Sequence, residues 1–263
     1  MASEPAQQDL MGVLRAAADT ASSSFGALRG RVDASDLRAG GTRAGQYALD
    51  LTVDEAVLGT LRSEAARRGL SFRVLSEESG LTGPAEDLTV VVDPVDGSSN
   101  ASRGLPWFAC ALCVLDDQGP WVSLVRNLAT GTTWEALRGG GARRDGTPIS
   151  CASTTAIGDA FVVLNGHSPR HFGWRQYRAM GATALDICAV ADGSVDATID
   201  CTTDALGPWD YMGAMLVLTE AGGHIADATG RDLVVLDPAQ RRTPVSACTE
   251  SLFEAALAAR RSI

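Results

Sequence analysis

The pattern of apolar residues changes near residue 150, and this change constrains the fold more than any other feature of the sequence. Before it, three apolar stretches between residues 107 and 142 are separated by Gly, Asp and Asn, which predicts a meander of antiparallel strands. After it, short β-branched runs alternate with stretches of helical spacing, as is typical of α/β proteins. We therefore expect an α+β half over residues 1–150 and an α/β half over residues 151–263.

The periodicity also predicts the individual elements. In the first half we expect helices over about 6–28 and 44–69, followed by strands over 72–76 and 88–93. In the second half we expect, in order, a strand over 160–166, helices over about 169–179 and 183–193, a strand over 195–200, a helix over 209–223, strands over 224–228 and 244–249, and a last helix over 251–261.

Composition restricts the class of protein. Hydrophobic residues make up 45% of the 263 residues, and no apolar run approaches the roughly 18 to 20 residues that a membrane-spanning helix requires. The beginning of the sequence has early acidic residues and no basic stretch before an apolar block, so we expect no secretory signal and a cytoplasmic protein. The formal net charge of −10 disfavours nucleic acid and membranes as partners, because both bind basic surfaces, but it permits a small anionic substrate.

The cysteines and histidines do not form a recognisable metal site. Cys110 and Cys113 lie inside an apolar stretch that is expected to be a strand, so buried free thiols are the simplest interpretation. His167 and His171 are four residues apart, but the Ser-Pro pair after His167 resembles a helix start, which would leave His167 outside that helix. We therefore expect the histidines to be structural or surface residues.

Residues 93–100, DPVDGSSN, place two carboxylates three positions apart in one tight turn. Asp93 ends the run LTVVVD, so its carboxylate is expected at the carboxyl end of a strand, where α/β proteins usually bind ligands. Pro94 and Gly97 can aim Asp93 and Asp96 at one point, and two such carboxylates tolerate each other when a divalent cation lies between them. Oxygen ligands at this density favour magnesium, manganese or calcium over zinc.

The GSSN segment that follows offers hydroxyls and successive backbone N–H groups, an arrangement suited to a phosphate. An ordinary acidic turn that caps a helix is the alternative explanation for the whole stretch, since Asp, Gly, Ser and Asn are the usual turn residues.

Two further acidic segments are ambiguous when taken alone. Glu77 and Glu78 follow the run FRVLS, where paired glutamates are commonly just solvated. Asp210 lies in the first turn of an expected helix after Pro208, where an acid ordinarily interacts with the helix dipole. In this order with DPVDGSSN, however, SEE and WDYMGAMLVLTEAGG resemble the motifs of the inositol monophosphatase family, within the superfamily of magnesium-dependent, lithium-sensitive phosphatases. The resemblance spans nearly the whole chain and implies a layered αβαβα sandwich.

The resemblance also implies a set of site residues. Two or three Mg²⁺ ions, or Mn²⁺ in their place, would be held by Glu77, Asp93, Asp96, Asp210 and the main-chain carbonyl of Val95. The phosphate would be received by Gly97, Ser98 and Ser99. Asp54 matches the family acid that pairs with the motif hydroxyl, here Ser98, to activate the attacking water, and Glu77 is also expected in the catalytic set. Gly181, Ala182 and Thr183 match the substrate loop and are expected near the alcohol part of the substrate.

Several positions depart from the family pattern. Ser76 stands where the family usually has Gly, and Ser98 replaces the usual Thr but keeps the hydroxyl. Arg43 stands where many members carry a lysine near the site. Thr203 or Asp204 occupies the region where animal enzymes place a glutamate that binds inositol, so the substrate stays open.

The leading hypothesis is a Mg²⁺-dependent phosphomonoesterase for a small polyol or sugar phosphate, with myo-inositol 1-phosphate as the first candidate and a homodimer implied by the family. The alternative keeps the chemistry and changes the substrate to fructose 1,6-bisphosphate, histidinol phosphate, a 3'-phosphonucleotide, or a sugar or nucleoside phosphate of a specialised pathway. The sequence shows no obvious aromatic or basic residues suited to a nucleotide base. A catalytically inactive relative with a binding or regulatory role is disfavoured, because every matched acid is present.

Overall fold

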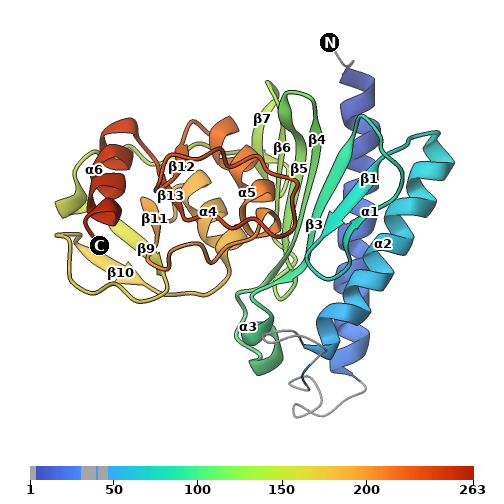
Figure 1. The fold of residues 1–263 in the computed structure, drawn as a ribbon, viewed down its shortest axis with the longest axis horizontal. Coiled ribbons are helices and arrows are strands. Elements are labelled where there is room, and N and C mark those ends of the chain that lie inside the picture. The colour runs from blue at the N-terminus through green and yellow to red at the C-terminus, as the bar shows by residue number, and fades with distance from the viewer. Residues whose placement is uncertain (1–3, 31–39, 41–46) are drawn as a thin grey trace.

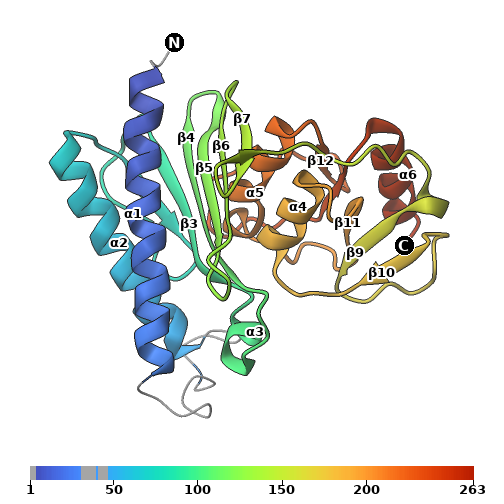
Figure 2. The same cartoon turned by 180° about the vertical axis from the view of Figure 1, so that it is seen from behind.

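The computed structural model describes residues 4–30, 40 and 47–263, and it shows five alternating layers of helix and sheet (Figure 1). Helices α1 and α2 cover one face of an eight-stranded sheet, and α4 and α5 pack between this sheet and a five-stranded one. Helix α6 covers the far face of the second sheet, and Figure 2 shows the same order from behind. The helices are α1 (Glu4–Arg29), α2 (Ala48–Arg68), α3 (Ser98–Arg103), α4 (Thr183–Ala191), α5 (Pro208–Glu220) and α6 (Glu250–Arg261). The expected αβαβα sandwich is confirmed.

The first sheet has the order β2-β1-β3-β4-β5-β6-β7-β8. Its pairings are antiparallel except for β1 with β3, which is parallel. The strands are β1 (Arg73–Ser76), β2 (Gly80–Thr82), β3 (Thr89–Asp96), β4 (Ala109–Asp116), β5 (Gly119–Asn127), β6 (Thr133–Leu137), β7 (Gly141–Arg144) and β8 (Thr147–Pro148). The expected meander is confirmed, with β4, β5 and β6 as consecutive antiparallel neighbours.

The second sheet has the order β10-β9-β11-β13-β12. Strand β9 pairs in parallel with both β10 and β11, so these three strands end at the same edge of the sheet. The strands are β9 (Phe161–Asn165), β10 (Gln176–Arg178), β11 (Ala197–Asp200), β12 (His224–Asp227) and β13 (Pro244–Ala247), with a short 3₁₀ helix at Ile157–Asp159 before them.

The helix expected over residues 169–179 is wrong, because the segment is irregular and then forms strand β10. Pro169 and Gly173 weaken any helix there. The backbone N–H groups of Arg175 and Gln176 both donate to the carbonyl of Ala160, and this begins the pairing with β9. Tertiary pairing with a strand therefore overrides the local helical spacing. The helix expected from residue 44 begins at Ala48, and the residues just before Tyr47 lie outside the described part of the chain.

Every residue of β3 is buried, which explains its continuous apolar run. Val90 and Val92 pack into the core beneath α1 and α2, whereas Val91 packs into the core shared with α4 and α5. Because both faces of β3 are covered, the acidic residues that continue this strand lie inside the molecule. No helix in the described ranges is long and apolar enough to cross a membrane.

Candidate active site

The centre of the candidate site is the carboxyl end of β3, where the ladder with β4 is interrupted. The pairing shifts register between Asp93 and Asp96, and an irregularity of this kind redirects side chains. Asp93 is 1% exposed and Asp96 is 7% exposed. The backbone N–H of Val95 donates to Asp93 Oδ1 at 3.0 Å. The Asp93 side chain therefore stabilises the turn between the two acids.

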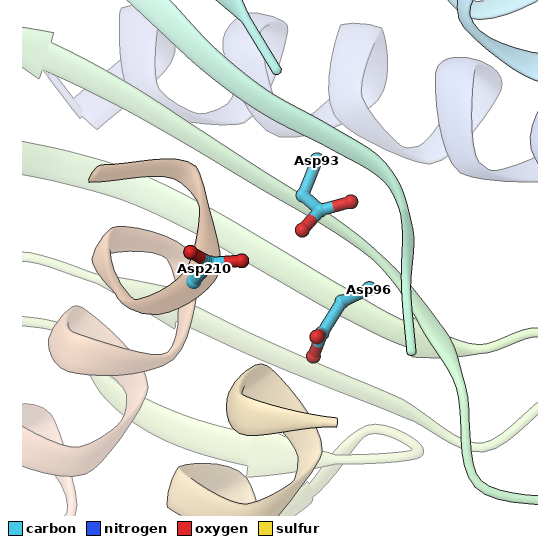
Figure 3. Close-up of side chains that lie close together, drawn as sticks. All are labelled: Asp93, Asp96 and Asp210. Carbon is cyan, nitrogen blue, oxygen red and sulfur yellow. The ribbon is translucent and has the colours of Figure 1, made fainter. Parts of the chain in front are cut away.

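Asp210 approaches these acids from the first turn of α5. Its carboxylate accepts a hydrogen bond from the backbone N–H of Gly207 at 2.6 Å, as an acid at this position of a helix commonly does. One carboxylate oxygen from each of Asp93, Asp96 and Asp210 lies within 4.8 Å of the others. Figure 3 shows two of the acids on β3 and the third across from them on α5. Two elements that are far apart in sequence thus bring together one acidic cluster.

Glu77 joins the cluster from the neighbouring strand. Its backbone N–H donates to the carbonyl of Val92 at 3.1 Å, which continues the parallel pairing of β1 with β3. This register sets Glu77 beside Asp93, the residue that follows Val92. The SEE and DPVD motifs are therefore neighbours because two parallel strands end together.

The cluster is electrostatically unfavourable without a cation. Burial, reinforced by the charges of Asp210 and Glu78, raises the pKa of Glu77 to about 8. Burial and neighbouring carboxylates likewise raise the pKa of Asp96 and of Asp210 to about 8, and raise the pKa of Asp93 well above its ordinary value. Asp93 Oδ2 is buried and has no hydrogen-bond partner among the described residues. Several buried carboxylates with an unsatisfied oxygen fit a hard divalent cation, which prefers oxygen ligands.

The expected phosphate turn follows directly and is fixed by close packing. Gly97 has φ +81°, and a Cβ there would lie 2.9 Å from the Cβ of Ala182 and 3.0 Å from the carbonyl oxygen of Gly181. Glycine is required on both counts. The side-chain amide of Asn100 donates to the carbonyl oxygens of Trp107, at 2.8 Å, and Met180, at 2.7 Å. The turn and the expected substrate loop are therefore held against each other.

The expected substrate loop also contacts the acidic cluster. The backbone N–H groups of Thr183 and Ala184 donate to the Asp96 carboxylate at 3.2 and 2.7 Å. Figure 3 shows this carboxylate directed toward the start of α4. The structure thus brings Gly181, Ala182 and Thr183 next to the DPVDG turn.

These acids, in this order and on this fold, match a known family. The model of the inositol monophosphatase family matches residues 9–263. This chain belongs to that family. Fructose-1,6-bisphosphatase/inositol-1-monophosphatase from Thermococcus kodakarensis is 32% identical over 182 residues, which cover 68% of this chain and 70% of that protein. Nus factor SuhB of Escherichia coli is 29% identical over 201 residues, which cover 69% of this chain and 71% of that protein.

A solved structure agrees with the fold. The extragenic suppressor protein suhB from Bartonella henselae superposes with a TM-score of 0.81 at 22% identity, covering 96% of this chain and 98% of the other. As a member of the inositol monophosphatase family, the protein is a phosphoric monoester hydrolase, and its acidic cluster fits the metal dependence of that family.

The pairing expected between Asp54 and Ser98 is not what the structure of this family member shows. The Asp54 carboxylate accepts hydrogen bonds from the hydroxyls of Ser76 and Ser79, so it joins α2 to the end of β1. Asp50, one helical turn earlier, is the acid that interacts with the Ser98 hydroxyl. Because α2 begins at Ala48, residue 50 rather than residue 54 lies in the first turn of the helix.

Asp50 is buried, and its environment differs from that of an ordinary capping acid. The backbone N–H of Tyr47 donates to Asp50 Oδ2 at 2.9 Å, whereas Oδ1 has no hydrogen-bond partner within the described residues. Burial raises the pKa of Asp50 to about 7, although the hydrogen bond from Tyr47 and the Ser98 hydroxyl oppose the rise. The Tyr47 hydroxyl lies 3.2 Å from the Ser99 hydroxyl. The sequence signal for Asp50 is an acid in the first turn of the helix. Asp54 lies one turn later on the same helix face, so the sequence alone does not distinguish the two acids.

Asp204, a further expected site residue, contacts a basic side chain. The Asp204 carboxylate is paired with the guanidinium of Arg231, which also bonds Asp227. Thr203, its neighbour, accepts a hydrogen bond from Arg260. The Asp204 carboxylate therefore takes part in an ion pair. Arg43 lies outside the described residues.

Proposed function

We propose that this protein is a Mg²⁺-dependent phosphomonoesterase that hydrolyses the phosphate ester of a small polyol or sugar, with myo-inositol 1-phosphate as the first substrate to test. The observation that carries the proposal is the convergence of Glu77, Asp93, Asp96 and Asp210 beside the closely packed turn at Gly97. Fructose 1,6-bisphosphate is the second candidate, because the names of several relatives include both activities.

The four carboxylates and the main-chain carbonyl of Val95 would hold two or three Mg²⁺ ions. When bound, these cations neutralise the carboxylates and the phosphate, lower the pKa of a bound water and stabilise the charge that develops on the leaving oxygen. The buried and unsatisfied Asp93 Oδ2 supports a ligand role for that residue in particular.

The chain's own residues supply the positioning and the proton transfer. Backbone N–H groups and hydroxyls of Gly97, Ser98 and Ser99 would bind the phosphate oxygens. Asp50 and the Ser98 hydroxyl would accept the proton of the water that attacks phosphorus, a role that suits a carboxyl whose pKa is near 7. Gly181, Ala182 and Thr183 would contact the alcohol part of the substrate, because they lie across from Gly97. No phosphorylated enzyme residue is required.

The remaining properties of the proposal come from the family. We propose that lithium inhibits the enzyme, that it works in the cytoplasm without nucleic acid or membrane partners, and that it forms a homodimer. The net charge of −10 supports a small anionic substrate over nucleic acid as the main ligand.

A phosphate-release screen tests this function. Inositol, fructose, histidinol, nucleotide and aminosugar phosphates would be incubated with the enzyme in MgCl₂, in EDTA, and in MgCl₂ with LiCl. We expect release only with Mg²⁺ and its inhibition by Li⁺. Release from any of these esters that is unaffected by EDTA contradicts the proposal.

A further inference from the structure

Helix α4 is joined to the first half of the chain at each end by a hydrogen bond between an indole and a carboxylate. At its amino end, Trp107 Nε1 donates to Asp186 Oδ1 at 2.7 Å. At its carboxyl end, Trp134 Nε1 donates to Asp192 Oδ2 at 3.0 Å. The two acids are about 9 Å apart along the helix axis. The first of these bonds lies beside the expected substrate loop, because the backbone N–H of Asp186 donates to the carbonyl of Ala182 at 2.9 Å.

Asp186 differs from an ordinary acid in the first turn of a helix. Such an acid commonly interacts with the backbone N–H groups that have no partner at the helix start. In α4 the N–H groups of Thr183 and Ala184 donate to Asp96 instead, and the Asp186 side chain accepts the indole N–H of Trp107. Asp186 is 3% exposed, and burial raises its pKa to about 7, although the bond from Trp107 opposes the rise. The indole therefore stabilises a buried carboxylate.

Trp107 also contacts the expected phosphate turn, through its main chain. Its carbonyl oxygen accepts a hydrogen bond from the side-chain amide of Asn100 at 2.8 Å. A Cβ added to Gly97 would lie 3.2 Å from the same oxygen, which is a tight contact. Trp107 thus contacts the turn with its backbone and α4 with its side chain, so it connects the two.

Other hydrogen bonds hold the expected substrate loop to the turn, but they come from residues of the site itself. Asp96, which accepts the N–H groups at the start of α4, belongs to the proposed cation ligands. Asn100, which donates to the carbonyl just before the loop, is part of the GSSN segment. The bond between Trp107 and Asp186 uses no side chain of the proposed cation and phosphate sites. It is therefore independent of what those sites bind.

We propose that Trp107 and Asp186 are positioning residues, whose hydrogen bond fixes the expected substrate loop at the distance from the phosphate turn that the alcohol part of the substrate requires. They act through the loop and the turn rather than on the reacting atoms. This inference rests on the proposed function, which assigns the loop and the turn to the two parts of the ester. A displacement of about 1 Å within a site can lower a rate about a hundredfold, so one bond at the base of the loop is enough to affect catalysis.

Four substitutions separate this positioning role from general stability. Trp107→Phe keeps a ring and the backbone carbonyl but removes the indole N–H. Asp186→Ala removes the acceptor, whereas Asp186→Asn keeps a side-chain oxygen that accepts the same bond. Trp134→Phe is the matched control, because it removes the equivalent bond at the other end of α4.

The kinetic measurement uses the ester that is hydrolysed best in the phosphate-release screen, at saturating MgCl₂. For each variant, kcat and KM are determined together with the inhibition constant of inorganic phosphate, which has no alcohol part. Amide hydrogen exchange of residues 179–187 is followed by mass spectrometry without substrate. Thermal unfolding measures the stability of each variant.

We expect Trp107→Phe and Asp186→Ala to lower kcat/KM about ten- to a hundredfold. Asp186→Asn should stay within about threefold of wild type, because the hydrogen bond is retained. The inhibition constant of inorganic phosphate should change by less than about twofold, because the backbone groups of the turn are intact. Trp134→Phe should lose as much thermal stability as Trp107→Phe but keep kcat/KM within about twofold of wild type. Exchange over 179–187 should be faster in Trp107→Phe and unchanged in Trp134→Phe.

Several results would overturn the inference. If Trp134→Phe loses as much kcat/KM as Trp107→Phe, activity simply follows stability. If Asp186→Asn is as impaired as Asp186→Ala, the charge of Asp186 matters and its hydrogen bond does not. If the inhibition constant of inorganic phosphate rises in parallel with the loss of kcat/KM, the bond acts on the phosphate turn and not on the loop.

Failure of the proposed function gives a different result. If the wild-type protein releases no phosphate from any ester in MgCl₂, the proposed function fails, and the exchange measurement still tests the bond. Exchange over 179–187 that is the same in Trp107→Phe as in wild type would mean that the bond does not fix the loop.

Discussion

The carboxylate of Asp96 accepts a hydrogen bond from the backbone N–H of Ala184 at 2.7 Å, which joins the end of β3 to the first turn of α4. Asp96 thereby orients a helix start while belonging to the acidic cluster. Its negative charge also interacts favourably with the amino end of the helix, although burial still raises its pKa to about 8. The proposed cation site and the expected substrate loop therefore share one side chain.

Substitutions of Asp50 and of Asp54 should have different effects, the first on catalysis and the second on stability. Asp50→Asn removes the group that interacts with Ser98, so we expect kcat to fall by about 10²- to 10⁴-fold with little change in KM. Asp54→Asn weakens the bonds to Ser76 and Ser79, and we expect it to lower the melting temperature more than it lowers kcat. Steady-state kinetics and thermal unfolding of both variants check this. A larger loss of kcat in Asp54→Asn, with a larger loss of melting temperature in Asp50→Asn, would show that Asp54 is the residue that activates the water.

Gly97 should be far less replaceable than another glycine of similar backbone conformation. Gly97→Ala introduces both left-handed strain and contacts with Ala182 and Gly181, so we expect a loss of about 1 to 3 kcal/mol beyond the strain alone, together with loss of activity. Gly222 has φ +90° and open space around its Cβ position, so Gly222→Ala reports the strain alone. Urea unfolding of both variants measures the difference. Equal losses would mean that the turn at Gly97 is not tightly packed.

The stability of the metal-free protein should fall as the pH rises. Ordinary carboxyls lose their protons near pH 4, whereas Glu77, Asp96 and Asp210 retain theirs up to about 8 in the metal-free folded state. The unfolded chain therefore binds fewer protons in this window, and the stabilisation present below about pH 4 is lost as the pH approaches about 8. Mg²⁺ should offset this loss, so its effect on the melting temperature should be larger at about pH 8.5 than at about pH 5.5.

Thermal unfolding in EDTA and in excess MgCl₂ at the two pH values gives the comparison. A Mg²⁺ effect that is equal at both values, or larger at the acidic one, would mean that these carboxyls do not bind the cation.

Asp186 allows the same electrostatic reasoning to be tested outside the expected ligand set. Burial raises its pKa to about 7, and Trp107 Nε1 donates to its Oδ1 at 2.7 Å. Asp186→Asn keeps an acceptor for Trp107 and removes the buried charge, so we expect the metal-free protein to gain up to about 4 kcal/mol at pH 8.5 and less at pH 5.5. Asp186→Ala loses the acceptor and should be less stable than Asp186→Asn in urea unfolding. A destabilised Asn variant at pH 8.5 would contradict the prediction.

The sequence predicts much of the fold because strong local patterns agree with the tertiary contacts. The run of valines before Asp93 predicts a strand, and Gly97 predicts a turn with a backbone angle that only glycine readily adopts. The prediction of a helix over 169–179 fails because the local helical spacing competes with strand pairing to β9. This pairing is a long-range contact, which local sequence patterns do not reveal.

The site is predicted less completely than the fold. Glu77, Asp93, Asp96 and Asp210 follow from motifs, and the structure does bring three of these carboxylates within 4.8 Å and places Glu77 alongside. Asp50 and Asp54 lie one turn apart on the same helix face, so only the observed start of α2 distinguishes them.

The most direct test of the central claim is the Mg²⁺ dependence of phosphate release by Asp93→Asn. The variant keeps the size of the side chain and removes the buried carboxylate whose Oδ2 has no partner among the described residues. Glu55→Gln, at an exposed acid on α2, is the control for loss of one negative charge. We predict that Asp93→Asn lowers kcat/KM by about a thousandfold or more at saturating Mg²⁺, whereas Glu55→Gln matches wild type. Activity in Asp93→Asn close to that of wild type, or activity that survives EDTA, would contradict the account.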